Sequence, residues 1–235
     1  MRRGLIALLL GLAAFAAEPP KLMFWAWERP VDLRRLPARA GVAFLAVTVE
    51  LRGEKVRVTP RLQPLLTPPG VYRMAVVRIQ SAHPEFSPKQ RDVVVKAISE
   101  AARVTHAEAT QIDYDALASE RPFYAAVLQR VRSALGPRHF LSITALVSWC
   151  HEGSWLTGLP VDEVVPMTFE MGADTAAVET LLRSGGKFEN AVCRDSIGIS
   201  TRELAVRQRG ARRTYVFSYD DWDEKSTRLV LDRFP

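Results

Sequence analysis

The chain contains 235 residues, of which 48% are hydrophobic and 25% are charged, a composition typical of a folded globular protein. These proportions exclude a disordered, collagenous or coiled-coil chain. The formal net charge is +6, and the 32 basic residues are spread along the whole length. A nucleic-acid-binding surface concentrates its basic residues on one face, so this dispersal argues against a nucleic-acid partner.

The N-terminal segment has the three parts of an export signal. Arg2 and Arg3 supply a positive start, residues 5–15 form a short apolar run, and Ala14-Phe15-Ala16 offers small residues for cleavage. We therefore predict a signal peptide over residues 1–16 and one mature domain over residues 17–235. The apolar run is too short to span a bilayer, so no membrane span is expected in the mature chain. A retained N-terminal anchor is the alternative, and either interpretation makes the folded part periplasmic or extracellular.

Eight apolar or β-branched runs along the mature chain predict eight strands. They cover residues 22–27, 42–51, 74–80, 110–115, 140–147, 164–170, 196–200 and 215–219. Helical patterns lie between several of these runs. One begins at Ser87 and Pro88, an N-cap followed by proline at the first helical position, with Gln90 completing a capping box. Two more helices are predicted to begin near Ser119 and Asp174.

The connection after the second strand has a different pattern. Residues 47–51 and 56–58 flank a polar turn at residues 52–55, which is typical of a β-hairpin. A proline-rich piece follows at residues 60–70, so a hairpin and a loop are expected in place of the second crossover helix.

Strands that alternate with helices imply a mostly parallel sheet. The predicted fold is therefore an α/β fold, a compact (β/α)8 TIM-type barrel with a β-hairpin and loop insertion after strand 2. An open, doubly wound sheet is the alternative. The first predicted strand is followed by Glu28-Arg29-Pro30 rather than by a glycine-rich loop, which counts against a dinucleotide-binding fold.

The two cysteines, Cys150 and Cys193, would occupy a compartment in which disulfides form. The predicted strands put Cys150 just after one strand and Cys193 just before another, at opposite ends of a parallel sheet. That separation exceeds disulfide geometry, so two buried thiols are the favoured prediction and a bridge is the alternative. The cysteines and histidines lack zinc-site spacing, and no metal or other cofactor is expected.

Polar side chains gather at the predicted C-terminal ends of the strands, where the active sites of (β/α)8 barrels lie. Carboxylates accept hydrogen bonds from sugar hydroxyls, and indole rings offer flat surfaces for the apolar faces of sugar rings. We therefore predict a cleft for a polysaccharide or oligosaccharide. Its predicted binding residues are Trp27, Arg78, Gln111, Trp149, Asp220 and Trp222.

Two aspartates at the end of the fourth predicted strand are candidate catalytic residues. Asp113 and Asp115 occupy alternate positions, so both face the barrel interior if Ile112 and Tyr114 pack on the helices. Two close carboxylates raise the pKa of one of them, which suits general acid–base catalysis. The structural alternative is an ion pair between Arg78 and Asp113 that satisfies a polar barrel interior.

Two glutamates complete the predicted catalytic set. Glu170 ends the sixth predicted strand and could reach the aspartates from across the barrel, and Glu28 follows the first strand. The structural alternative for either residue is a charge in water at the rim. Trp222 likewise has two interpretations, the floor of a sugar subsite or a cap on the hydrophobic core.

Four segments together resemble a family of exported bacterial proteins that is labelled only as a domain of unknown function. They are Phe-Trp-Ala-Trp-Glu-Arg-Pro at residues 24–30, Gln-Ile-Asp-Tyr-Asp at 111–115, Leu-Ser-Ile-Thr-Ala-Leu at 141–146 and Val-Asp-Glu-Val-Val-Pro-Met at 161–167. The resemblance covers nearly the whole mature chain. That family looks related to TIM-barrel glycoside hydrolases, so the resemblance implies a barrel and no particular reaction.

The same segments are more distantly similar to the chitinase family, whose fourth strand carries Asp-x-x-Asp-x-Asp-x-Glu. Asp113 and Asp115 match the second and third acids of that motif, and Thr110 stands at the first. Leu117 replaces the glutamate that protonates the leaving group in the chitinases. The resemblance thus implies a carbohydrate site whose expected acid is missing.

The ends of two later strands extend this similarity. Met167 and Trp222 match residues of the sixth and eighth chitinase strands, whereas Phe169 replaces a tyrosine. We expect an exported carbohydrate-active barrel, with glycoside hydrolysis of a polysaccharide at the C-terminal rim as the leading hypothesis. The alternative is a non-catalytic glycan-binding or envelope-associated protein that has lost the general acid.

Overall fold

The structure is a computed structural model that describes residues 18–151, 154–204, 206 and 208–235. The predicted signal peptide at residues 1–16 lies outside the described residues. Across the described part of the chain, no helix has both the length and the apolar character needed to cross a bilayer.

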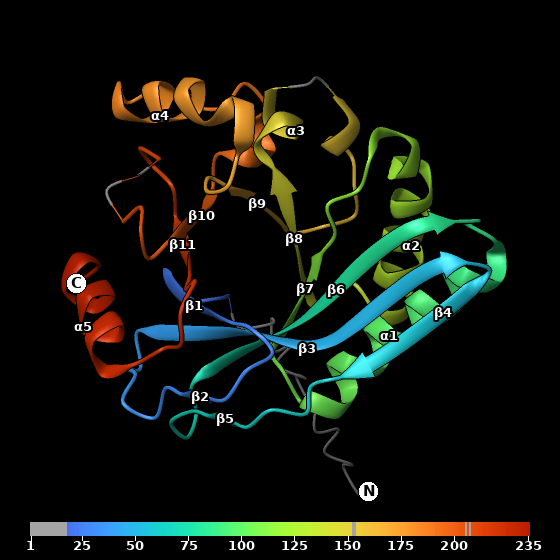
Figure 1. Cartoon of the computed structure of the whole chain (residues 1–235), viewed down its shortest axis with the longest axis horizontal. Helices are drawn as coiled ribbons and strands as arrows, with labels where there is room; N and C mark the ends of the chain where they lie inside the picture. The colour runs from blue at the N-terminus through green and yellow to red at the C-terminus, as the bar shows by residue number, and fades with distance from the viewer. Residues whose placement is uncertain (1–17, 152–153, 205, 207) are drawn as a thin grey trace, which may run out of the picture.

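Eight parallel strands close into a barrel, as the sequence predicts (Figure 1). β1 pairs in parallel with both β3 and β11, and this pairing closes the sheet. The fold is therefore a TIM-type (β/α)8 barrel, and the open-sheet alternative is wrong. The barrel strands are β1 (Leu22–Ala26), β3 (Ala40–Gly53), β6 (Tyr72–Pro84), β7 (Ala109–Asp113), β8 (Phe140–Leu146), β9 (Glu163–Met167), β10 (Ser196–Ser200) and β11 (Arg213–Phe217).

The barrel strands are buried on both faces, as expected of a parallel sheet covered by helices. Every residue of β1, β7 and β10 is buried. Side chains such as Trp25, Met74 and Tyr215 fill the barrel interior. The alternate residues, Ile112 among them, pack outward against the helices, so the predicted inward face of β7 is confirmed.

The helices lie outside the barrel wall (Figure 1). The α1 helix begins as predicted, because the Ser87 hydroxyl accepts a hydrogen bond from the Gln90 N–H at 3.2 Å and the Gln90 side chain accepts one from the Ser87 N–H at 3.2 Å. This capping box satisfies two backbone donors at the helix end. The helices are α1 (Pro88–Thr105), α2 (Arg121–Leu135), α3 (Val147–His151), α4 (Thr175–Arg183) and α5 (Glu224–Arg233), with 3-10 turns η1 (Ala118–Glu120), η2 (Ser154–Leu156), η3 (Gly172–Asp174) and η4 (Ala191–Cys193).

Strands β3 and β6 continue beyond the barrel wall. β4 (Lys55–Pro60) pairs antiparallel with the outer half of β3 after a turn at Gly53, whose φ of +53° is in the left-handed region. We call this three-stranded extension, residues 47–60 and 77–84, the arm; its reverse face packs over α1 (Figure 1). Two short strands, β2 (Val31–Asp32) and β5 (Leu65–Leu66), pair with each other in the flanking loops.

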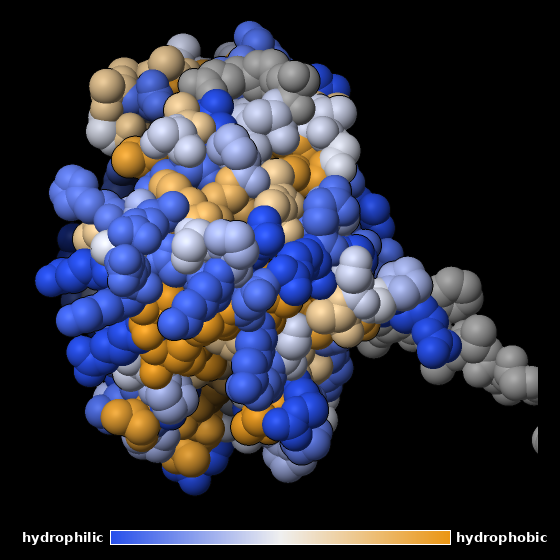
Figure 2. All heavy atoms as spheres, turned by 90° about the vertical axis from the view of Figure 1, so that its right-hand side faces the viewer, coloured by the Kyte–Doolittle hydropathy of each residue, from blue (hydrophilic) through white to orange (hydrophobic). Residues whose placement is uncertain are grey.

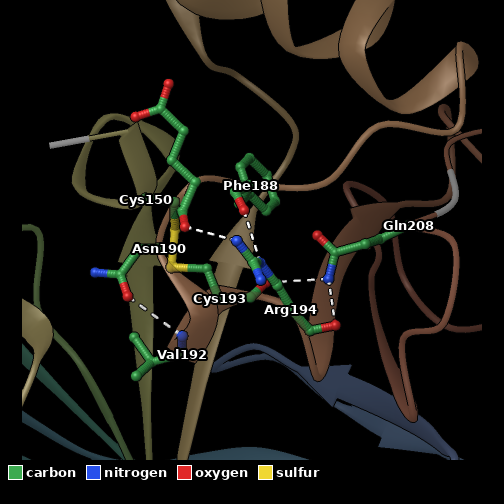
Figure 3. Close-up of a disulfide and its surroundings, with 8 residues drawn as sticks. Cys150, Phe188, Asn190, Val192, Cys193, Arg194 and Gln208 are labelled. Carbon is green, nitrogen blue, oxygen red and sulfur yellow. Dashed lines mark hydrogen bonds between the residues drawn. A yellow bond between two sulfur atoms is a disulfide. The ribbon is translucent and has the colours of Figure 1, made fainter. Parts of the chain in front are cut away.

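Cys150 and Cys193 form a disulfide, so the favoured prediction of two separate thiols is wrong (Figure 3). After β8 the chain enters α3, which carries Cys150 over the outer side of β9, and η4 brings Cys193 to the same place. The Asn190 N–H donates to the Cys150 carbonyl at 3.0 Å, and the Gln208 side chain donates to the Cys193 carbonyl at 3.0 Å. Both cysteines lie in the outer layer rather than at strand ends. The distance between opposite ends of the sheet, on which the prediction rested, therefore does not separate them.

Candidate active site at the carboxyl ends of the strands

A pocket of about 270 Å³ opens at the C-terminal ends of the barrel strands. Four carboxylates, one guanidinium group and three aromatic rings surround it. The location is the one at which barrels of this type hold their active sites. The lining residues are Trp27, Arg78, Asp113, Asp115, Leu146, Val147, Ser148, Met167, Phe169, Glu170, Met171, Asp174 and Phe217.

Asp113 ends β7 with only 5% of its surface exposed. The Thr144 hydroxyl donates to one of its carboxylate oxygens at 2.8 Å, and Arg78 lies 3.4 Å from the other. The predicted ion pair between Arg78 and Asp113 is therefore present. Burial nevertheless raises the pKa of Asp113 to about 6, because the loss of water penalises the charged form more than Arg78 favours it.

Asp115 lies two residues beyond Asp113 and reaches solvent through the pocket. Protein atoms around it displace enough water to raise the pKa of Asp115 as well, although Arg78 acts in the opposite direction. Its negative charge also adds to the increase in the pKa of Asp113. The pocket thus contains two carboxyl groups whose surroundings favour protonation, a condition that suits proton transfer near neutral pH.

Glu170 enters the pocket from the loop after β9. Its φ is +53°, a left-handed backbone conformation that residues other than glycine seldom adopt. Burial, together with the nearby Glu170 carboxylate, raises the pKa of Tyr219 to about 12. Strained backbone of this kind occurs most often at functional sites, where the surrounding structure holds it in place.

Aromatic rings form one wall of the pocket. The guanidinium carbon of Arg78 lies 5.1 Å from the ring centroid of Trp27, within the range of a cation–π contact. Trp27 packs on Trp25 with a centroid distance of 4.3 Å, and Phe217 packs on both Trp25 and Phe169. Phe169 and Phe217 are not among the predicted binding residues. The sequence feature that could have identified them is their position at the ends of two predicted strands.

Two of the predicted rim residues lie outside the pocket lining. Glu28 accepts hydrogen bonds from the N–H groups of Leu62 and Gln63 at 2.7 and 3.0 Å, so its carboxylate holds the loop after β4. Asp220 has a side chain that is 85% exposed, at 4.0 Å from Arg202. Asp220 therefore fits the structural alternative of a charge in water at the rim, whereas Glu28 has a structural role in the loop after β4.

Three further predicted binding residues are buried elsewhere. Trp149 is 1% exposed in α3, and Trp222 is 6% exposed and donates its ring N–H to the Trp25 carbonyl at 2.9 Å. Both rings belong to the outer core, because the chain turns outward after the strand ends. Gln111 faces the barrel interior as predicted but lies deeper than the pocket, where it accepts a hydrogen bond from the Trp25 ring at 2.9 Å.

A buried polar network that the sequence analysis missed fills the barrel near the start of β9. Glu163 is 6% exposed and forms an ion pair with Arg213. Its carboxylate also accepts hydrogen bonds from Tyr215 at 2.6 Å and Ser142 at 2.8 Å. These partners compensate a buried charge, so the network is structural rather than part of the pocket.

No protein-family model matches the sequence, and neither does any curated protein. Solved structures of similar fold include a putative chitinase A from Streptomyces coelicolor, with a TM-score of 0.59 and 10% identity over 91% of this chain and 96% of that one. The spore cortex-lytic enzyme SleL from Bacillus cereus has a TM-score of 0.54 and 12% identity over 93% of this chain and 75% of its own.

A family GH18 chitinase from Chromobacterium violaceum is similar in the same way. Its TM-score is 0.52, with 12% identity over 92% of this chain and 81% of that one. At such low identities the similarity establishes the fold alone. The chain is therefore a TIM-type barrel whose structural neighbours are chitinase-like barrels, in agreement with the resemblance seen in its sequence motifs.

Proposed function

We propose that this chain is an exported carbohydrate-active barrel that hydrolyses a polysaccharide in the pocket at the carboxyl ends of its strands. The observation that carries the proposal is the convergence of Asp113, Asp115 and Glu170 with the ring of Trp27 around one pocket. Neighbours of the same fold that are named as chitinases and as a cortex-lytic enzyme support a polysaccharide as the substrate.

Glycoside hydrolysis needs a proton for the leaving oxygen and negative charge near the sugar ring, which becomes positive in the transition state. In our proposal Glu170 gives its proton to the leaving oxygen as the bond to the anomeric carbon breaks. Water then adds to that carbon and gives one proton back to the Glu170 carboxylate. Asp115 and Asp113 stabilise the positive charge on the ring. Trp27 offers its indole as a surface for the sugar, and Arg78 fixes the position of Asp113.

Export is part of the proposal and rests on two observations. The pattern of residues 1–16 is that of a signal peptide. The disulfide between Cys150 and Cys193 supports an oxidising compartment, because such bonds are rare in the cytosol.

A second candidate function is glycan binding without hydrolysis. The observation in its favour is Leu117, which stands where the chitinase motif has its proton donor. Leu117 is 66% exposed and is absent from the pocket lining. A barrel that lost this acid could keep Trp27 and the aspartates as a binding site.

The test is the release of reducing ends by the purified protein from a panel of bacterial polysaccharides, with the variants Asp115→Asn and Glu170→Gln. The matched control is Glu28→Gln, which removes a carboxylate outside the pocket. We expect the two pocket variants to lose about a hundredfold or more in activity, the range of general acid–base catalysis, while the control keeps it. Equal activity in all three variants would contradict the assignment of the pocket. Saturable binding without hydrolysis would support the second candidate.

A further inference from the structure

The arm has an open polar face on the side opposite α1. Its residues form three rows, each made of directly paired positions on β4, β3 and β6, and paired positions share one face of a sheet. Val49 and Leu51, between these positions, are buried on the reverse face. Successive rows are two residues apart, so the face extends roughly 13 Å along the strands. The rows are Thr59, Thr48 and Arg78; Arg57, Glu50 and Gln80; and Lys55, Arg52 and Ala82.

Positive charge exceeds negative charge on this face. The side chain of Arg57 is 77% exposed and lies 3.9 Å from Glu50. Arg52 and Lys55 are exposed at the outer end, and within the described ranges no ion pair engages either of them. Arg78 is paired with Asp113, so the face itself carries three cations, at Arg52, Lys55 and Arg57. The carboxylates of Glu50 and of Glu54 in the turn are fewer than these cations. Figure 2 looks at the molecule from the end to which the arm extends, and hydrophilic residues cover much of this view.

The arm face is continuous with the pocket, because Arg78 belongs to both. It occupies the innermost row of the arm, opposite Thr48, and it also lines the pocket 3.4 Å from Asp113. A polymer with one sugar in the pocket can therefore continue across the rows of β3 and β4.

We propose that the arm is an extension of the glycan site and binds a polysaccharide that carries carboxylate groups, an inference that rests on the proposed function. Guanidinium groups are suited to carboxylates, because their paired N–H donors match the two oxygens. The three rows contain no aromatic ring, so charge and hydroxyl contacts provide the recognition here. Asp115, which is negatively charged in our proposal, repels anionic groups from the pocket and so directs those groups of the polymer to the arm.

The test measures binding of the full mature protein to hyaluronate, alginate and polygalacturonate, each compared with its methyl-esterified form. Esterification keeps the sugar backbone and removes the charge. We expect at least one of the acidic polymers to bind about tenfold or more tightly than its ester, with an affinity that decreases as salt is added. The triple variant Arg52→Gln/Lys55→Gln/Arg57→Gln should lose this preference.

The matched control is Lys89→Gln/Lys96→Gln/Arg103→Gln, which removes three exposed charges from α1, behind the arm. It should bind like the wild type. Equal binding of the acidic polymers and their esters would overturn the arm proposal. An equal loss of the preference for the acidic polymer in both triple variants would overturn it as well. If neutral glycans still bind and Trp27→Ala weakens their binding, the proposed function stands and only the arm proposal fails. Absence of binding to every glycan would overturn both.

Discussion

Asp113 combines a buried carboxyl group with a positively charged neighbour, and the two have opposite effects on its pKa. Burial has the larger effect, so the pKa is about 6 even though Arg78 lies 3.4 Å away. In our proposal Asp113 acts in its ionised form, because it stabilises positive charge on the sugar. Hydrolysis should therefore decrease as the pH falls below about 6.

The same pKa also affects stability, and this effect can be measured without a substrate. The folded protein holds the Asp113 proton up to a pH of about 6, whereas an unfolded aspartate loses it near 3.8. Ionisation of Asp113 therefore lowers the free energy of unfolding as the pH rises through this interval. A shift of about two pKa units corresponds to about 3 kcal/mol.

Asp113→Asn removes this titration. We expect the free energy of unfolding of the variant, relative to the wild type, to increase by about 3 kcal/mol between about pH 4 and pH 8 in urea denaturation. Asp220→Asn, at a side chain that is 85% exposed, is the control and should show no such trend. A difference between Asp113→Asn and wild type that does not change with pH would contradict the assigned pKa.

At the scale of elements, the sequence predicts the barrel strands well because their burial depends on local pattern. The predicted runs coincide with all eight strands of the barrel, and the capping box at Ser87 marks the start of α1. A local pattern does not indicate where a chain turns after its strand ends. Trp149 and Trp222 follow strands β8 and β11 closely, yet both rings lie in the outer core. The burial of these rings and the disulfide depend on how α3, η4 and the last loop pack.

The disulfide links α3 to η4, which are elements of five and three residues. The sequence separation of the cysteines is 43 residues. In the chain-entropy model, closing a loop of this size stabilises the folded state by about 4 kcal/mol.

The double variant Cys150→Ala/Cys193→Ala should therefore lose about 3–4 kcal/mol in free energy of unfolding, measured by denaturant titration. Reduction of the wild type should cause a comparable loss and should leave the double variant unchanged. A double variant as stable as the oxidised wild type would show that the bond contributes little to stability.

At the scale of the whole molecule, the closed barrel brings residues from distant strands to one end. Trp27 follows β1, Asp113 ends β7 and Glu170 follows β9, yet all three line one pocket. The rule that strand ends meet at one rim predicted this convergence. The same rule predicted Glu28 at the pocket, whereas its carboxylate binds the backbone of Leu62 and Gln63 outside it. This contact depends on how the loop after β4 folds, which the strand pattern does not indicate. The arm extends the same end of the barrel with a charged surface.

The central claim is that the pocket at the carboxyl ends of the strands is a glycan site. Calorimetric titration of the best-binding polysaccharide fragment into wild type, Trp27→Ala and Phe234→Ala tests it most directly. Phe234 lines a cavity at the opposite end of the barrel, so its truncation is a matched control. We predict that Trp27→Ala weakens binding about tenfold or more and that Phe234→Ala leaves it unchanged. Unchanged affinity in Trp27→Ala, or an equal loss in Phe234→Ala, would contradict the claim.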